Sequence, residues 1–265
     1  MSRFSGRRGE SLWGSGDITG KDKIMDREKL NRFFGNAISN LENHFEADHA
    51  PKRFTCQTAR SMLSIYDLCM EIEPDHVVEV GTNHGGSTLA IIMALRDLHR
   101  TLGNITSIDL THKTWMDVPQ IHANIVKGMG IDFSLVKTIS GDFSKIEPSR
   151  SVIPAGKTSV FYDMHDHEGP WSQILLDNWV PLIEDGFVAI HDFSKVPDGY
   201  TPKQDDRPRS AAKYTYTSQT YSGFAEVKRV IEWANDNQVL LHDLVGGVWF
   251  KVRNGVSIKW DKNVN

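Results

Sequence analysis

The sequence has few of the features that mark secreted, membrane-spanning or nucleic-acid-binding proteins. It contains 2 cysteines in 265 residues, too few for a disulfide framework and in keeping with a reducing compartment. Its longest uninterrupted apolar run is Leu89 to Leu95, whereas a membrane-spanning helix needs roughly 20 apolar residues. The 30 basic residues are outnumbered by 34 acidic ones, so no global positive field gathers nucleic acid. We therefore expect neither a membrane nor a nucleic-acid partner.

The N-terminal quarter differs in pattern from the rest. Residues 1–24 are rich in Gly, Ser and Arg, and their basic start lacks the apolar core of a signal peptide. This composition predicts a mobile arm and a cytoplasmic location. Residues 25–73 carry amphipathic helical patterns at 26–46 and 55–72, and Pro74 ends the second. We expect both helices to cap one main domain formed by residues 74–265.

From residue 74 onward, short β-rich runs alternate with helical stretches, which is typical of a parallel sheet built from βαβ units. The predicted parallel strands are 76–80, 104–110, 133–139, 159–162 and 186–190. The predicted helices between them are 87–100, 117–129 and 171–183. After one more helix, two runs at 238–245 and 248–252 meet at Gly246 and Gly247, which predicts an antiparallel hairpin. The pattern predicts an α/β fold with a doubly wound, seven-stranded, mostly parallel sheet.

A Gly-rich turn joins the first strand of this domain to the first helix. The residues that we single out there are Glu79, Gly81, Thr82, Asn83, Gly85 and Ser87. Glycines let backbone N–H groups approach a ligand, and a helix N-terminus favours anionic groups. Asn83 stands where the dinucleotide fingerprint has its middle glycine. Glu79 favours a ligand with an ammonium group; the alternative is a plain turn with a surface glutamate.

Two later segments complete a recognisable pattern. Residues 160–169 read Val-Phe-Tyr-Asp-Met-His-Asp-His-Glu-Gly, and residues 186–192 read Gly-Phe-Val-Ala-Ile-His-Asp. Together with the Gly-rich turn they resemble the class I S-adenosylmethionine-dependent methyltransferases, especially the cephalosporin-hydroxylase-like and macrolide-sugar O-methyltransferase group. The resemblance covers about residues 55–193. It implies a Rossmann-like methyltransferase fold and S-adenosylmethionine as the cofactor.

The resemblance also implies how the rest of the cofactor is held. Asp109 ends the second strand, where the family places a carboxylate on the ribose hydroxyls. Asp142 and Phe143 follow the third strand, where the family places an acidic residue and an apolar neighbour near the adenine. The alternatives are a helix cap or solvated charge at Asp109 and ordinary turn chemistry at Asp142.

A third group of residues carries the expected chemistry. Asp163 follows the fourth strand, and His191 and Asp192 follow the fifth, so all three emerge at the carboxyl edge of a parallel sheet. Oxygen ligands with one imidazole suit Mg²⁺, Mn²⁺ or a softer divalent ion. The alternative is a hydrogen-bonded pair of His191 and Asp192 without a metal.

Histidines near Asp163 are the candidate bases. His165 or His167, on the loop after the fourth strand, can take a hydroxyl proton because an imidazole is mostly neutral at pH 7. With Asp163, they are the predicted catalytic residues. The resemblance then implies an O-methyltransferase that acts on a hydroxyl of a small molecule, such as a sugar or natural-product scaffold.

Other functions and features are left open at this stage. A hydroxylase or hydrolase on the same fold is one alternative, and a non-catalytic cofactor-binding scaffold is another. Residues 195–223, with three prolines and four tyrosines, predict a lid over the acceptor, or else an insertion without a role. A homo-oligomer is compatible with the sequence, which does not fix the oligomeric state.

Overall fold

The computed structural model describes residues 26–46, 58–82, 85–100, 104–110, 136–164, 170–191, 225–245 and 247–258. The predicted arm (1–24), the predicted helix 117–129 and the predicted lid (195–223) lie outside these ranges. None of the helices in the described ranges is long and apolar enough to cross a membrane.

The helical elements are α1 (Arg27–Glu46), α2 (Ala59–Ile72), α3 (Gly86–Asp97), η4 (Phe143–Lys145), α6 (Trp171–Ile174), η5 (Leu175–Trp179), η6 (Val180–Leu182) and α7 (Ala225–Asp236). The strands are β1 (His76–Val80), β2 (Ile105–Asp109), β3 (Lys137–Ser140), β4 (Thr158–Tyr162), β5 (Asp185–His191), β6 (His242–Leu244), β7 (Gly247–Arg253) and β8 (Val256–Ile258).

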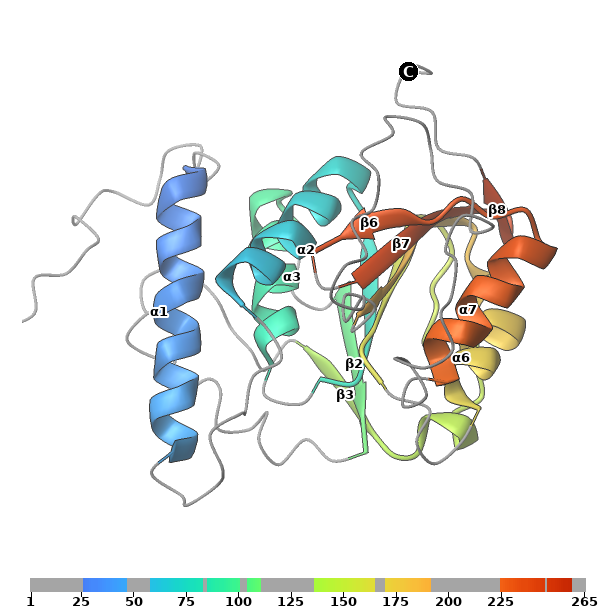
Figure 1. The fold of residues 1–265 in the computed structure, drawn as a ribbon, viewed down its shortest axis with the longest axis horizontal. Helices are drawn as coiled ribbons and strands as arrows, with labels where there is room; N and C mark the ends of the chain where they lie inside the picture. The colour runs from blue at the N-terminus through green and yellow to red at the C-terminus, as the bar shows by residue number, and fades with distance from the viewer. Residues whose placement is uncertain are drawn as a thin grey trace, which may run out of the picture.

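One sheet with the order β3-β2-β1-β4-β5-β7-β6 organises the described chain (Figure 1). Strands β1 to β5 are parallel, and β7 runs antiparallel to β5 along its whole length. The order reverses between β1 and β4, which is the switch point where doubly wound folds bind ligands. The predicted fold class, with its parallel strands and closing hairpin, is confirmed.

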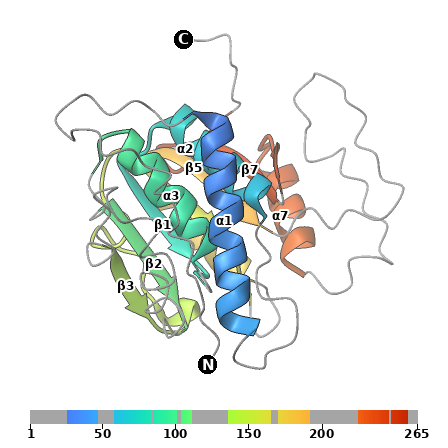
Figure 2. The same cartoon turned by 90° about the vertical axis from the view of Figure 1, so that its left-hand side faces the viewer.

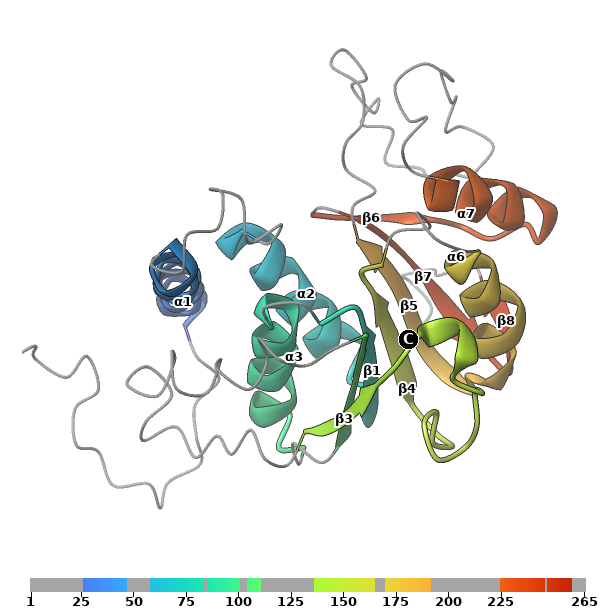
Figure 3. The ribbon, with the colours of Figure 1, turned by 90° about the horizontal axis from the view of Figure 1, so that it is seen from below.

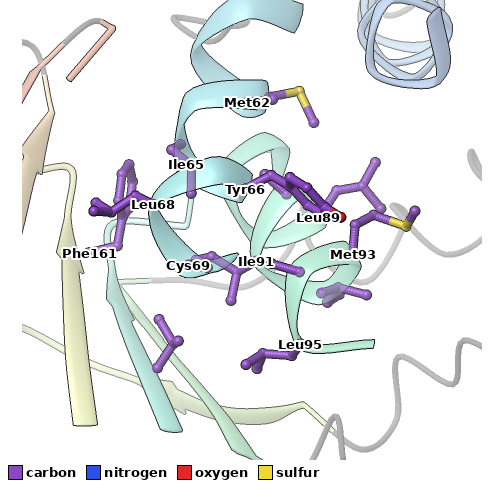
Figure 4. Packing of buried hydrophobic residues seen from close by; sticks show 14 of the residues in the cluster. Met62, Ile65, Tyr66, Leu68, Cys69, Leu89, Ile91, Met93, Leu95 and Phe161 are labelled. Carbon is purple, nitrogen blue, oxygen red and sulfur yellow. The ribbon is translucent and has the colours of Figure 1, made fainter. Parts of the chain in front are cut away.

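Helices cover both faces of this sheet (Figure 3). Helices α2 and α3 lie on one face with α1 outside them, and α6 and α7 lie on the other (Figures 2 and 3). A hydroxyl cap starts α2, because the Thr58 side chain accepts a hydrogen bond from the Ser61 N–H at 3.1 Å. Figure 4 shows Ile65 and Leu68 of α2 turned toward Phe161 of β4. These buried contacts fix α2 and α3 over the strands that carry the site.

The structure differs from the sequence prediction in three elements. An eighth strand, β8, pairs with β7 through a turn at Asn254 and Gly255, whose φ angles are 52° and 70°. The expected strand 238–245 shrinks to β6, because Gln238 has a φ of 54° and Val239 N–H closes the end of α7 on Ala234 O. The expected helix 171–183 changes from α to π to 3-10 geometry along its length.

Candidate active site

Strand alternation gathers the polar side chains of the site on one face of the sheet. Val77, Ile105 and Phe161 belong to the apolar core beneath α2 and α3. Alternate residues of a strand share a face, so the residues two positions later also point to that side. These are Glu79, Ser107 and Asp163, and the same argument from Phe187 and Ala189 places His191 there.

Gly81 allows the Gly-rich turn to approach Asp163. Its φ is 84°, and a Cβ atom there would lie 2.2 Å from the backbone oxygen of Asp163. The Gly81 N–H donates to Ile108 O at 2.8 Å, and the Asp163 N–H donates to Val80 O at 2.8 Å. The backbone of the Gly-rich turn and that of the predicted catalytic aspartate are therefore in direct contact. Any side chain at Gly81 would push them apart.

Glu79 lies beneath the start of α3 and is fully buried. Its carboxylate accepts hydrogen bonds from the hydroxyls of Ser87, at 2.5 Å, and Thr88. Burial raises the pKa of Glu79 to about 7, the two hydroxyls oppose the rise, and the nearby carboxylates of Asp163 and Asp109 add to it. The alternative of a surface glutamate is wrong. Its predicted contact with the cofactor stays a prediction.

The ends of β1 and β2 meet through a second polar pair. The buried hydroxyls of Thr82 and Ser107 are hydrogen-bonded to each other. Asp109 ends β2 with a half-buried side chain, and Leu110 beside it is 66% exposed, the large apolar side chain with most exposure in the described chain. Sequence reasoning overlooked Leu110 and Thr88. A signal for Leu110 was available, since an apolar residue follows a strand-end carboxylate.

The turn after β3 divides into an exposed and a buried part. Asp142 caps η4 by accepting from the backbone N–H and hydroxyl of Ser144 at 2.9 and 2.7 Å, and these bonds lower the pKa of Asp142. Phe143 is fully buried, with its ring centroid 4.7 Å from that of Trp179. A contact between Phe143 and adenine stays a prediction, and it requires that ring to become exposed.

Asp163 and His191 form the centre of the site. His191 is the last residue of β5, and its Nδ1 lies 3.0 Å from Oδ1 of Asp163. The His191 side chain is 2% exposed and that of Asp163 is 16% exposed, so a protein environment rather than bulk water surrounds this hydrogen bond. The described chain thus pairs His191 with Asp163.

The remaining predicted site residues lie outside the described ranges. They are Asn83, His165, His167 and Asp192. Within the described ranges, no group of three or more His, Cys, Asp or Glu residues is arranged to hold a metal ion. Asp192 lies outside the described ranges, so the metal site of Asp163, His191 and Asp192 stays a prediction.

Residues 78–193 match a family described as a methyltransferase domain. Among solved structures, the chain is similar to cofactor-bound Rv0187 from MTB, with 11% identity, a TM-score of 0.51, and coverage of 84% of this chain and 90% of that one. It is also similar to TomG, an O-methyltransferase of Streptomyces achromogenes involved in tomaymycin synthesis and solved with SAM. Here the identity is 15%, the TM-score 0.50, and the coverage 87% of this chain and 99% of that one. No curated protein sequence matches the chain significantly.

At these identities the solved structures show a shared fold, and the family match runs from within β1 to just past β5, with the Gly-rich turn, Asp163 and His191. The predicted family therefore agrees with the independent match to residues 78–193. Residues 78–193 thus match a methyltransferase domain, and the solved structures show that the chain shares the fold of methyltransferases.

Proposed function

We propose that this chain is an S-adenosylmethionine-dependent methyltransferase, which transfers the methyl group of the cofactor to a hydroxyl oxygen of a small molecule, such as a sugar or a natural-product scaffold. The observation that carries the proposal is the Asp163–His191 pair, whose side chains lie 3.0 Å apart at the carboxyl edge of the sheet. A carboxylate that binds one ring nitrogen orients an imidazole for proton transfer. Hydroxyl acceptors require such a group, because a neutral alcohol is a poor nucleophile.

The donor set at this edge suits S-adenosylmethionine. Asp109 offers a half-exposed carboxylate for two ribose hydroxyls, and the exposed Leu110 beside it offers an apolar surface for a purine ring. Glu79, Asp109 and Asp163 give the edge a negative character that favours a cationic ligand. The bound cofactor supplies an electrophilic methyl group on a sulfonium centre.

The residues of this chain then have two tasks, to align the acceptor and to remove its proton. With Asp163 ionised, the Nδ1–H of His191 donates to Oδ1, and Nε2 is the nitrogen that accepts a proton. His191 thereby joins His165 and His167 as a candidate base. Asp163 acts by orienting the imidazole and by stabilising the imidazolium that proton transfer produces.

A divalent ion is the second part of the proposal. Carboxylate oxygens and an imidazole nitrogen are ligands that Mg²⁺, Mn²⁺ and softer divalent ions accept. An ion bound by Asp163, His191 and Asp192 would require metal coordination to replace the hydrogen bond between Asp163 and His191. Such an ion would lower the pKa of a coordinated acceptor hydroxyl.

The experiment is a transfer assay with S-adenosylmethionine labelled in its methyl group and a panel of hydroxylated small molecules, each paired with its amino and thiol analogues. The proposal expects label on oxygen. Label on nitrogen, sulfur or carbon, or turnover that ignores the hydroxyl, would contradict it.

The same assay distinguishes proton removal by a histidine from assistance by a divalent ion. His165, His167 and His191 are substituted by Gln one at a time. Loss of the residue that acts as the base should lower turnover by about a hundredfold or more, while cofactor binding persists. If a metal takes part, EDTA abolishes transfer, an added cation restores it, and Asp192→Ala prevents the rescue. Full activity after metal removal would take the ion out of the proposal.

A further inference from the structure

The Glu79 carboxylate is bonded by two neighbouring hydroxyls of the first turn of α3. Ser87 and Thr88 are consecutive residues, and each donates to a different carboxylate oxygen of Glu79. All three side chains are 2% exposed or less. This bidentate contact joins the end of β1 to the start of α3 across the Gly-rich turn. Thr88 takes part although the family pattern at this turn ends at Ser87.

The groups around Glu79 act on its negative charge in opposite directions. Asp163, after β4, and Asp109, at the end of β2, both repel it. The first turn of α3 contains no acidic residue, and its hydroxyls favour the ionised form. On the inward face of α2, Tyr66 and Cys69 both have pKa values raised far above neutrality by burial. Glu79 is therefore balanced near neutral pH, with its own pKa at about 7.

A hydrogen bond from a hydroxyl shifts the pKa of Glu79 because it stabilises the ionised carboxylate and not the protonated one. A hydroxyl that donates to a carboxylate stabilises the ionised form, and removing it leaves a buried charge with one fewer donor. The start of α3 adds to the effect, since backbone N–H groups at a helix N-terminus favour nearby anions. A cation arriving at this turn stabilises the same ionised form.

We propose that Thr88 is a positioning residue of the cofactor site, which acts together with Ser87 to hold Glu79 as an oriented carboxylate that attracts the positively charged end of the cofactor. The inference rests on the part of the proposed function that assigns S-adenosylmethionine as the cofactor, and it does not depend on the acceptor. Cofactor binding is then coupled to ionisation of Glu79. Below neutral pH the protein must release a proton from Glu79 to bind the cation.

The test is calorimetric titration of the full chain with S-adenosylmethionine at pH 6.0 and pH 8.5, with EDTA present, for the wild type and Thr88→Val. Valine keeps the shape of threonine and removes the hydroxyl. If loss of the hydroxyl raises the pKa of Glu79 by one, the Kd of the variant should be about tenfold that of the wild type at pH 6.0 and less than twofold at pH 8.5. Taking the ratio cancels the titration of the ligand itself.

Two controls separate positioning from packing. Thr88→Ser keeps the hydroxyl, so its Kd ratio should stay within about twofold of the wild type at both pH values. Thr158→Val removes another fully buried threonine hydroxyl, which donates to Pro154 O at 2.8 Å at the opposite end of the strands. This control should lower the melting temperature and leave the Kd ratio close to one at both pH values.

A neutral probe tests whether charge is the cause. 5′-Methylthioadenosine keeps the adenosine and the thioether but lacks the sulfonium and the amino-acid group, so Thr88→Val should bind it as the wild type does at both pH values. A pH-dependent loss with this probe would overturn the inference, as would an equal loss of S-adenosylmethionine binding at both pH values. Failure of S-adenosylmethionine to bind the wild type at any pH would instead refute the cofactor assignment itself.

Discussion

The two faces of the sheet use the same strands for different purposes. Toward α2 and α3, the strand ends present Glu79 and His191, which are both buried and hydrogen-bonded. Toward α6 and α7, the adjacent residues Val80 and Ile190 are fully buried among apolar side chains. Chemistry and packing are thus separated by one residue along each strand. A one-residue slip in register would exchange them.

The packing face should tolerate loss of volume least. Trp179 is fully buried against Phe143, and within the described chain its indole N–H has no hydrogen-bond partner. Trp179→Ala should therefore lower the free energy of unfolding by about 3–5 kcal/mol, measured by chemical denaturation. Trp179→Phe keeps an aromatic ring and removes the unpaired donor, so it should cost less than about 1.5 kcal/mol. Equal losses would mean that the indole N–H has a role in the fold.

The chemical face should instead show a pH-dependent stability. Glu79 has a pKa of about 7 when folded against an ordinary value of 4.5, so the folded state holds more protons than the unfolded state between these values. Stability from this group is therefore lost as the pH rises from 4.5 to 7. Relative to Glu79→Gln, the wild type should lose roughly 3 kcal/mol over this interval. A difference that stays flat or grows with pH would contradict this account of Glu79.

The Gly-rich turn between β1 and α3 should be sensitive to backbone strain. Gly81→Val adds a side chain at a φ of 84° and against the backbone of Asp163. It should cost more than about 2 kcal/mol of stability and weaken S-adenosylmethionine binding at least tenfold, or about 1.4 kcal/mol. Gly35→Ala is the matched control, because a Cβ at Gly35 in α1 meets nothing within 4 Å. That change should stabilise the helix by about 0.5–1 kcal/mol.

Local sequence patterns were sufficient to predict most of the fold. Alternating strand and helix patterns predicted the parallel strands, and Gly246–Gly247 predicted the hairpin of β6 and β7. The Asn254–Gly255 dipeptide is a strong signal for the turn before β8 and was overlooked. The π geometry of η5 has no comparable local signal in the sequence.

The site could be predicted as a set of residues but not as a set of contacts. Parallel strands that end together predicted that Asp163 and His191 would lie at one edge, and the structure brings them to 3.0 Å. The partners of Glu79 depend on how α3 packs over β1, which no motif specifies. The sequence therefore suggested a cofactor-facing glutamate, which stays a prediction, and gave no sign of the hydrogen bonds that Glu79 accepts from Ser87 and Thr88.

The most direct test of the central claim is calorimetric titration of the wild type and of Asp109→Ala with S-adenosylmethionine and with NAD. We expect the wild type to bind S-adenosylmethionine, and Asp109→Ala to bind it at least about tenfold more weakly because the ribose hydroxyls lose their acceptor, a difference of about 1.4 kcal/mol. We expect no comparable affinity for NAD, since Asn83 replaces the middle glycine of the dinucleotide fingerprint. Binding of NAD without binding of S-adenosylmethionine would contradict the account.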